Sequence, residues 1–354
     1  MFSAFGSRVR WWFVVLPPAA AEPAPPASGS DPGSGIPGSY TLHLLHTAPH
    51  GESMAMGANE TNGMVVGMAR KGSTSYVPSV WLDGARYDLP LPPGTTQGVL
   101  YAVNRAGSAV GIGNGVNERA VVYHRGVMTL LAPLAGARTV AEDIDEAGFV
   151  VGASSDAAAG HPHTAVLWTP DGQPVSLGTP ASATSFARAI NAAHQIVGEV
   201  GYATGPQPFL WENGTLRSLA VLPGDPHGSA ADINEHGVIA GSSRDLSPPV
   251  YKESQAVIWI DGVVQALPMP AGVAWSSSTA INDGGQVVGE ASRHPNGPKH
   301  SFLWRNGTLA FLEELTAAYP GWSFGAVTDI DEAGRITGWG DLNGAVHAFV
   351  LPPP

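Results

Sequence analysis

A short pattern, Asn-x-x-Gly-x-Val-Val-Gly, returns about every 45 residues along almost the whole chain. Its clearest copies are Asn191–Gly198, Asn234–Gly241 and Asn282–Gly289. Variants stand at Asn104–Gly111, Asp145–Gly152 and Asp331–Gly338, and a degenerate first copy, with Glu60 in place of the Asn, stands at Glu60–Gly67. A unit of this size is too small to bury a core of its own, so the repeats must pack on one another as one array.

A second block follows each copy: a short apolar run, an aromatic residue and, in six of the seven units, a turn with Gly. Asn-Gly or Asp-Gly between apolar runs is a strong hairpin signal, because both central residues of a type I′ turn need positive φ. Five of the aromatic residues are tryptophans at one repeated position, and we expect them to pack between units. They are Trp81, Trp168, Trp211, Trp259 and Trp304.

Each unit therefore predicts four short antiparallel strands, which we name a to d: a before the Asn turn, b the Val-Val-Gly run, c the aromatic run and d after the hairpin turn. Four strands in 40–50 residues are typical of a propeller blade. We predict an all-β fold, a seven-bladed β-propeller. An open β-solenoid is the alternative.

The two ends of the array predict that the ring closes. The seventh unit reaches strand c at His347–Leu351 and has no strand d after it, whereas Ser39–Leu45 is a strand without a unit before the first strand a. Pairing of this N-terminal strand with the last strand c would complete the seventh blade and remove two exposed edges.

Composition restricts the classes of partner. The chain of 354 residues has a net charge of −12 and only three lysines, which argues against nucleic acid and anionic membrane surfaces. It has no cysteine, which excludes disulfides, thiolate catalysis and cysteine metal sites. We expect a monomer that takes no cofactor.

The first residues differ from the array. Arg8 and Arg10 precede a short apolar run and an Ala-rich step, so residues 1–21 are typical of a signal peptide. Residues 22–38 are a Pro/Gly/Ser-rich linker, and residues 39–354 form the single propeller domain. We expect an extracellular or periplasmic protein with no membrane insertion once the leader is removed.

The pairing of Ile-Asn-x-x-Gly-x-Val-Val-Gly with a later His-Ala-Phe-Leu-Trp-like run resembles the bacterial "probable extracellular repeat, HAF family". The naming triplet stands at His347-Ala348-Phe349, with a variant at His300-Ser301-Phe302. The resemblance covers about residues 40–351. It implies an exported, propeller-like repeat protein and no catalytic residue.

Chemical motifs are few. Asp143–Gly148 and Asp329–Gly334 look like calcium loops but lack later oxygen ligands, so we interpret these turns, and those of Asn104, Asn191, Asn234 and Asn282, as side-chain caps. His161 and His163 offer two imidazoles and no third zinc ligand. The adjacent acids Glu313 and Glu314 are expected on opposite faces of a strand, and we assign no catalytic or metal residue.

Aromatic residues that do not recur in every unit are the better candidates for binding. They lie in or beside the b–c and d–a connections, which emerge on one face of the disc and vary in length. The candidate ligand-binding residues are Trp275, Trp322, Tyr319, Tyr251, Tyr202 and Trp339. Trp275 and Trp322 are expected to line one groove, or else to fold back over their own loops.

Two functions remain. The first is a non-catalytic binding or scaffold module for a glycan or a protein, and the second is a hydrolase or lyase with a site at the mouth of the central channel. A ring of polar residues with shifted pKa values at that mouth would favour the enzyme, and an aromatic groove away from the axis would favour the binding module.

Overall fold

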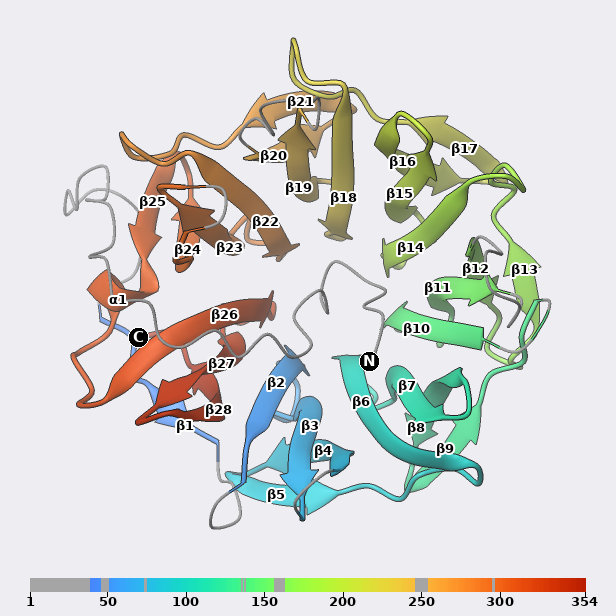
Figure 1. Ribbon diagram of the computed structural model, residues 1–354, viewed down its shortest axis with the longest axis horizontal. Coiled ribbons are helices and arrows are strands. Elements are labelled where there is room, and N and C mark those ends of the chain that lie inside the picture. The colour runs from blue at the N-terminus through green and yellow to red at the C-terminus, as the bar shows by residue number, and fades with distance from the viewer. Residues whose placement is uncertain are drawn as a thin grey trace.

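Seven antiparallel sheets of four strands each stand around a central axis in the computed structural model (Figure 1). The described residues are 39–45, 51–72, 75–134, 136, 138–155, 163–245, 254–294 and 297–354. The expected leader, the linker, Tyr251 and His161 lie outside them. The fold is the predicted seven-bladed β-propeller and not a solenoid.

The blades follow one another in chain order, and each sheet runs from the axis to the rim. The innermost strands, a, are β2 (Ser53–Ala58), β6 (Thr95–Val103), β10 (Arg138–Ile144), β14 (Thr184–Ile190), β18 (His227–Ile233), β22 (Trp275–Ile281) and β26 (Trp322–Ile330). The second strands, b, are β3 (Val65–Lys71), β7 (Ala109–Gly115), β11 (Val150–Ser155), β15 (Ile196–Tyr202), β19 (Ile239–Arg244), β23 (Val287–Ser292) and β27 (Ile336–Leu342). The third strands, c, are β4 (Ser75–Leu82), β8 (Glu118–His124), β12 (Thr164–Trp168), β16 (Gly205–Glu212), β20 (Ser254–Ile260), β24 (His300–Arg305) and β28 (Ala345–Leu351). The outer strands, d, are β5 (Ala85–Asp88), β9 (Val127–Leu130), β13 (Pro174–Ser176), β17 (Thr215–Ser218), β21 (Val263–Ala266), β25 (Thr308–Phe311) and β1 (His43–Leu44).

Both ends of the array build the seventh blade, as predicted. β1 pairs antiparallel with β28, with His43 opposite Val350. The paired strand has only two residues, but the residues on both sides of it also contact neighbouring blades. Tyr40 donates its N–H to the carbonyl of Leu315 after blade 6, and buried Leu45 packs in the core shared with blade 1. Residues 40–45 therefore form a strap across three blades.

Apolar cores lie between neighbouring blades rather than within one. Trp168 of blade 3 is fully buried against Ala102 and Val110 of blade 2, and its indole N–H donates to the carbonyl of Ala132 at 2.7 Å. Trp259 repeats this arrangement two blades further on. The predicted role of the repeated tryptophans in packing between blades is confirmed.

The c–d turns have the predicted chemistry. The residue before the Gly has φ near 50° at Asp83, Asn213, Asp261 and Asn306, as a type I′ turn requires. The expectation for Glu313 and Glu314 was wrong. They lie on a single-turn helix, α1 (Leu312–Leu315), which directly follows β25. Among the described residues no helix is long and apolar enough to cross a membrane.

The Asn turns connect strands a and b and do more than cap. Asn282 accepts from the N–H of Gln286 at 3.0 Å and donates its Nδ2 to the carbonyl of Asp331, the same position in the next blade, also at 3.0 Å. Asn234 and Asn191 repeat both bonds. The repeated residue therefore closes its own turn and joins its blade to the next.

Two blades have Asp at this position and lack the amide donor. In blade 7, Arg335 replaces it and donates to the carbonyl of Asn59 in blade 1 at 3.2 Å. In blade 3, the carboxylate of Asp145 lies 3.4 Å from the imidazole of His194 in blade 4. Polar contacts thus run around the whole ring, and we call this set the turn belt.

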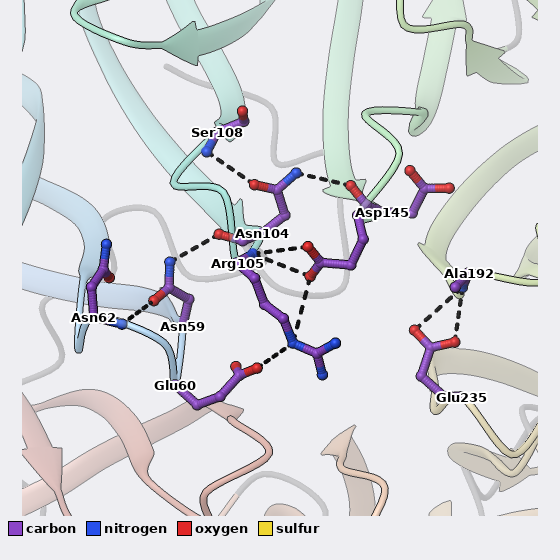
Figure 2. Close-up of polar contacts among 10 residues, drawn as sticks. Asn59, Glu60, Asn62, Asn104, Arg105, Ser108, Asp145, Ala192 and Glu235 are labelled. Carbon is purple, nitrogen blue, oxygen red and sulfur yellow. Dashed lines mark hydrogen bonds and ion pairs between the residues drawn. The ribbon is translucent and has the colours of Figure 1, made fainter.

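The first repeat was misread. The alignment on the closing Gly placed Glu60 at the Asn position, but Asn59 holds it, in a turn that is one residue longer. Asn59 donates to the carbonyl of Asn104 at 2.9 Å and accepts from the N–H of Asn62 (Figure 2). The residue after the Asn adds a second set of contacts to the belt: Arg105 pairs with Glu60, and Glu235 accepts from the N–H of Ala192 (Figure 2).

Candidate functional site

The two faces of the disc carry different elements. The turn belt and the c–d turns lie on one face, which we call the turn face. The b–c and d–a connections lie on the other, which we call the loop face.

Every innermost strand has a β-bulge at the same level. A bulge leaves one residue unpaired and re-aims its side chain, and bulges are frequent next to functional sites. Because these strands surround the axis (Figure 1), the bulged residues form a ring of one per blade. They are Met56, Tyr101, Glu142, Arg188, Ala231, Thr279 and Thr328. The ring is apolar in blades 1 and 2, charged in blades 3 and 4, and small in blades 5 to 7.

The charged pair is the centre of a larger group. Arg188 donates to Glu142 at 2.9 Å and to Glu199 at 2.7 Å, and its side chain is only 3% exposed. Glu199 also lies 3.9 Å from Arg244, at the loop-face end of β19. The guanidinium of Arg138, at the loop-face end of β10, acts on Glu118 of blade 2.

We call these six residues, on four successive blades, the charged sector. They are Glu118, Arg138, Glu142, Arg188, Glu199 and Arg244. Arg188 lies deepest, at the level of the bulges, while Arg138 and Arg244 mark the loop-face end and are half-buried.

The pKa values of this sector are shifted in different directions. Burial raises the pKa of Glu118 more than Arg138 lowers it. Burial also opposes the charge of Glu199, but Arg188 and Arg244 together hold its pKa below the ordinary value. His163 has its pKa lowered to about 4 by burial and by the guanidinium groups of Arg138 and Arg188. The environment therefore favours the charged form of Glu199 at the centre of the sector and the neutral form of Glu118 at its edge.

The two tryptophans predicted to line one groove lie in the opposite part of the ring. Trp275 and Trp322 begin the innermost strands of blades 6 and 7. Trp322 packs with the core shared by these two blades, and both side chains are partly buried. Trp275 shares its blade face with Glu290, two residues from Val288 of that same core, so both indoles lie at one interface between blades.

Neither indole is an open platform. The ammonium of Lys299 lies 4.3 Å from the ring centre of Trp275 and 2.9 Å from Glu290. Trp322 stacks edge-on against Phe324 and Phe349. Whether these indoles bind a ligand or seal the interface stays a prediction.

The other candidates are dispersed. Trp339 is partly buried on β27, where Gly325 of β26 leaves room for its ring. Tyr319 and Tyr202 are exposed, at 45% and 42%, in the connection before β26 and at the end of β15. Val116, at the tip of the blade 2 b–c hairpin, is 96% exposed and adds a third apolar side chain to the loop face.

The aspartates of the two turns that look like calcium loops accept hydrogen bonds from backbone N–H groups. Asp145 and Asp331 accept N–H groups of their own turns, from Phe149 and Arg335. Asp329 accepts from the N–H of Ala58 in the next blade. No group of three or more His, Asp or Glu side chains among the described residues is arranged to hold a metal ion.

Sequence reasoning missed the charged sector. Arg188 and Glu142 belong to no motif and stand at positions where the other blades have different residues, whereas Glu199 has a counterpart in Glu290 of blade 6. The available signal was the departure itself, a charge inside an otherwise apolar or small-residue strand repeat.

Comparisons with known proteins bear on the fold. No family model and no curated protein matches the chain. Among solved structures, it is similar to YCF48 bound to D1 peptide, with a TM-score of 0.57 and 10% identity over 94% of this chain and 100% of that one. It is also similar to the β-propeller domain of the Trilobed protease of Pyrococcus furiosus, with a TM-score of 0.52 and 11% identity over 89% and 94% of the two chains.

A third similar structure is the acylaminoacyl peptidase of Pyrococcus horikoshii, with a TM-score of 0.54 and 12% identity over 84% of this chain. This chain matches 52% of that peptidase. At such identities the likeness shows the propeller fold alone. The chain is a seven-bladed β-propeller of the class that includes both binding proteins and domains of peptidases.

Proposed function

We propose that the protein is an exported, non-catalytic binding or scaffold module whose glycan or protein ligand docks on the loop face. One observation carries the proposal: the repeated side chains of the turn belt bond to one another, whereas Arg138, Tyr202 and Trp275, which do not recur in the other blades, lie at the loop-face ends of their strands. Rigid scaffolds place binding in the elements that vary.

Two further points support it. YCF48, which is similar in fold, is described as bound to a peptide, which makes a protein partner a reasonable choice. Export and membership of the HAF repeat proteins belong to the proposal as well, and they rest on the basic and apolar leader after Arg8 and on the seven repeats.

The experiment uses the absence of cysteine from the chain. A single cysteine is introduced at Val116→Cys on the loop face or, as the matched control, at exposed Ala193→Cys on the turn face, and each is coupled to a polyethylene glycol maleimide. Ligands are first selected from a glycan array and a displayed peptide library with the unmodified chain. The proposal expects polymer at position 116 to abolish capture and polymer at position 193 to leave it unchanged; the opposite pattern would refute it.

One observation favours the alternative, a hydrolase or lyase at the channel mouth. Burial raises the pKa of Glu118 beside Arg138, as in a general acid. The centre of the sector argues for binding, since Glu142 and Glu199 both bond to Arg188 and hold it in a fixed position. Turnover of a selected ligand that is lost in Glu118→Gln would decide for the enzyme.

A further inference from the structure

The charged sector is not required by the architecture of the ring. At the level of the bulges, blades 5 to 7 have Ala231, Thr279 and Thr328 where blades 3 and 4 have Glu142 and Arg188. A buried ion pair contributes little net stability, because the loss of hydration offsets the attraction between its charges. These charges therefore call for a role other than stability.

Unused hydrogen-bonding capacity points to that role. The Nε atoms of Arg138 and Arg188, and the Oε2 atom of Glu118, are buried and have no partner among the described residues. Arg188 as a whole is 97% buried, so this donor is held inside the protein. Buried donors are nearly always bonded, and an unbonded one inside a charged group suggests that a further acceptor belongs there.

The balance of charge indicates which acceptor fits. The sector has three guanidinium groups and three carboxyl groups, and burial raises the pKa of Glu118 whereas Arg188 and Arg244 hold that of Glu199 below its ordinary value. With Glu118 protonated, the sector carries one positive charge in excess, within a chain of net charge −12. A single negative charge balances it, whereas a doubly charged phosphate would be repelled by Glu142 and Glu199.

Geometry selects a carboxylate among singly charged groups. A guanidinium presents its donors as a planar fork that matches the two oxygens of a carboxylate. Arg138 begins β10 of blade 3 and Arg244 ends β19 of blade 5, so both lie at the loop-face end, on the two blades that flank the blade of Arg188. They are half-buried, and so is Glu118.

The surroundings favour a peptide as the source of that carboxylate. The exposed apolar tips Val116 and Tyr202 stand on the b–c hairpins of blades 2 and 4, within the span of blades that holds the sector. Apolar side chains of a peptide can contact these tips while its carboxylate enters between them, and a polyhydroxylated sugar has less apolar surface to offer.

We propose that the charged sector is a binding site for one carboxylate group of a peptide or of an unfolded segment of a protein partner, with Arg138 and Arg244 as its contacting residues and Arg188 beneath them. The proposal rests on the loop face being the binding face. The carboxylate is either the C-terminus of the peptide or an acidic side chain within it.

The test uses the full chain and peptides selected from a displayed library. Each peptide is measured by calorimetry in four forms: unmodified, amidated at its C-terminus, with its Asp and Glu changed to Asn and Gln, and with both changes. The variants are Arg138→Met and Arg244→Met, and the matched control is Arg217→Met, an exposed arginine on β17 that changes the net charge equally.

We expect the doubly neutral peptide, and either site variant with the unmodified peptide, to bind at least about tenfold more weakly, as for the loss of a charge-assisted hydrogen bond. The two singly neutralised peptides identify the source of the carboxylate. The Arg217→Met chain should bind as the unchanged protein does, and circular dichroism should show all variants folded.

Equal affinity for neutral and charged peptides, or unchanged affinity in both arginine variants, would overturn the carboxylate site while leaving the loop face as a binding face. Capture of acidic oligosaccharides such as oligogalacturonate without capture of any peptide would overturn the peptide ligand. Loss of binding on modification at position 193 and not at 116 would overturn the proposed function itself.

Discussion

The turn face and the loop face of this propeller are made from the same seven units, yet they differ in how their polar groups are used. On the turn face, the side-chain amides of Asn282 and its counterparts form hydrogen bonds within their own turn and to the next blade. At the loop-face end of β10, by contrast, the Nε of half-buried Arg138 has no hydrogen-bond partner among the described residues. The difference distinguishes residues that join the blades from residues that keep hydrogen-bonding capacity for a ligand.

Repetition itself explains why. A contact between blades is needed seven times, so the side chain that makes it recurs, and the recurrence is what makes it visible in the sequence. A ligand breaks the symmetry of the ring and needs each of its contacts once. In a repeat protein of this kind, departures from the repeat are therefore better guides to binding than the repeat.

Closure of the ring supports both faces, so its loss should have the largest effect. Removal of residues 1–46 takes away buried Tyr40 and Leu45 together with β1, and should lower the free energy of unfolding by about 4 kcal/mol from burial alone. Removal of residues 1–38 should leave it nearly unchanged. Thermal melting of the two truncated chains makes the comparison, and equal melting temperatures would contradict the closed ring.

Substitutions in the charged sector should show whether its buried charges contribute to the stability of the fold. Arg188→Met alone removes the guanidinium that pairs with the buried carboxylates of Glu142 and Glu199 and should cost about 3–5 kcal/mol. Replacing all three by residues found at the same positions in blades 5 and 6, as Glu142→Thr, Arg188→Ala and Glu199→Ser, should cost less than the single change. Urea unfolding measures both, and a triple variant less stable than Arg188→Met would mean that the charges serve the fold.

Substitutions in the turn belt should lower the stability of the fold without changing ligand binding. Asn282→Ala leaves the N–H of Gln286 and the carbonyl of Asp331 without their partner and should cost about 1–3 kcal/mol. Ligand binding measured well below the melting temperature should be unchanged. A stability that falls on addition of a calcium chelator would instead identify the Asn and Asp turns as ion sites.

A smaller effect, with a pH dependence, is expected where the belt has Asp. Burial raises the pKa of Asp331 to about 6, above its ordinary value of 3.8. The folded chain thus takes up this proton before the unfolded chain does, and this carboxyl contributes stability as the pH falls from about 6 to about 4. Above about pH 6 its charge destabilises the fold. Asp331→Asn should therefore raise the free energy of unfolding by about 1–2 kcal/mol at pH 8.

The gain from Asp331→Asn should vanish below about pH 4, where the carboxyl is protonated in both states. Unfolding by urea at pH 8 and pH 4 measures it, and Asn282→Gln, in which the repeated amide is kept on a longer side chain, is a control whose effect should not depend on pH. A gain that is equal at both pH values would contradict the burial of a charged Asp331.

Much of the fold could be predicted because local chemistry decides it. Asn213-Gly214 and Asp261-Gly262 define hairpins through positive φ, and the missing last strand together with Ser39–Leu45 indicated closure. The exceptions have local causes. Asn59 was hidden by a turn one residue longer than its counterparts, and α1 replaces the end of an expected strand.

From the sequence, the candidate site could be assigned only to one face of the disc, the loop face. The connections that vary in length placed Tyr202 and Tyr319 on this face, and both are exposed there. Their role in ligand binding stays a prediction. The contacts of Trp275 with Lys299 and of Arg188 with Glu142 depend on how neighbouring strands and blades are placed, and no spacing in the sequence encodes them. The charged sector joins residues of four blades and becomes visible only once the ring is assembled.

The central claim is that binding and stability belong to opposite faces, and one paired measurement tests it. Affinity for a selected ligand and melting temperature are measured for Arg138→Met with Arg244→Met on the loop face, and for Asn234→Ala with Asn282→Ala in the turn belt. The account predicts lost affinity with little change in melting temperature for the first pair, and a lowered melting temperature with unchanged affinity for the second. Affinity lost in the belt variant and kept in the arginine variant would contradict it.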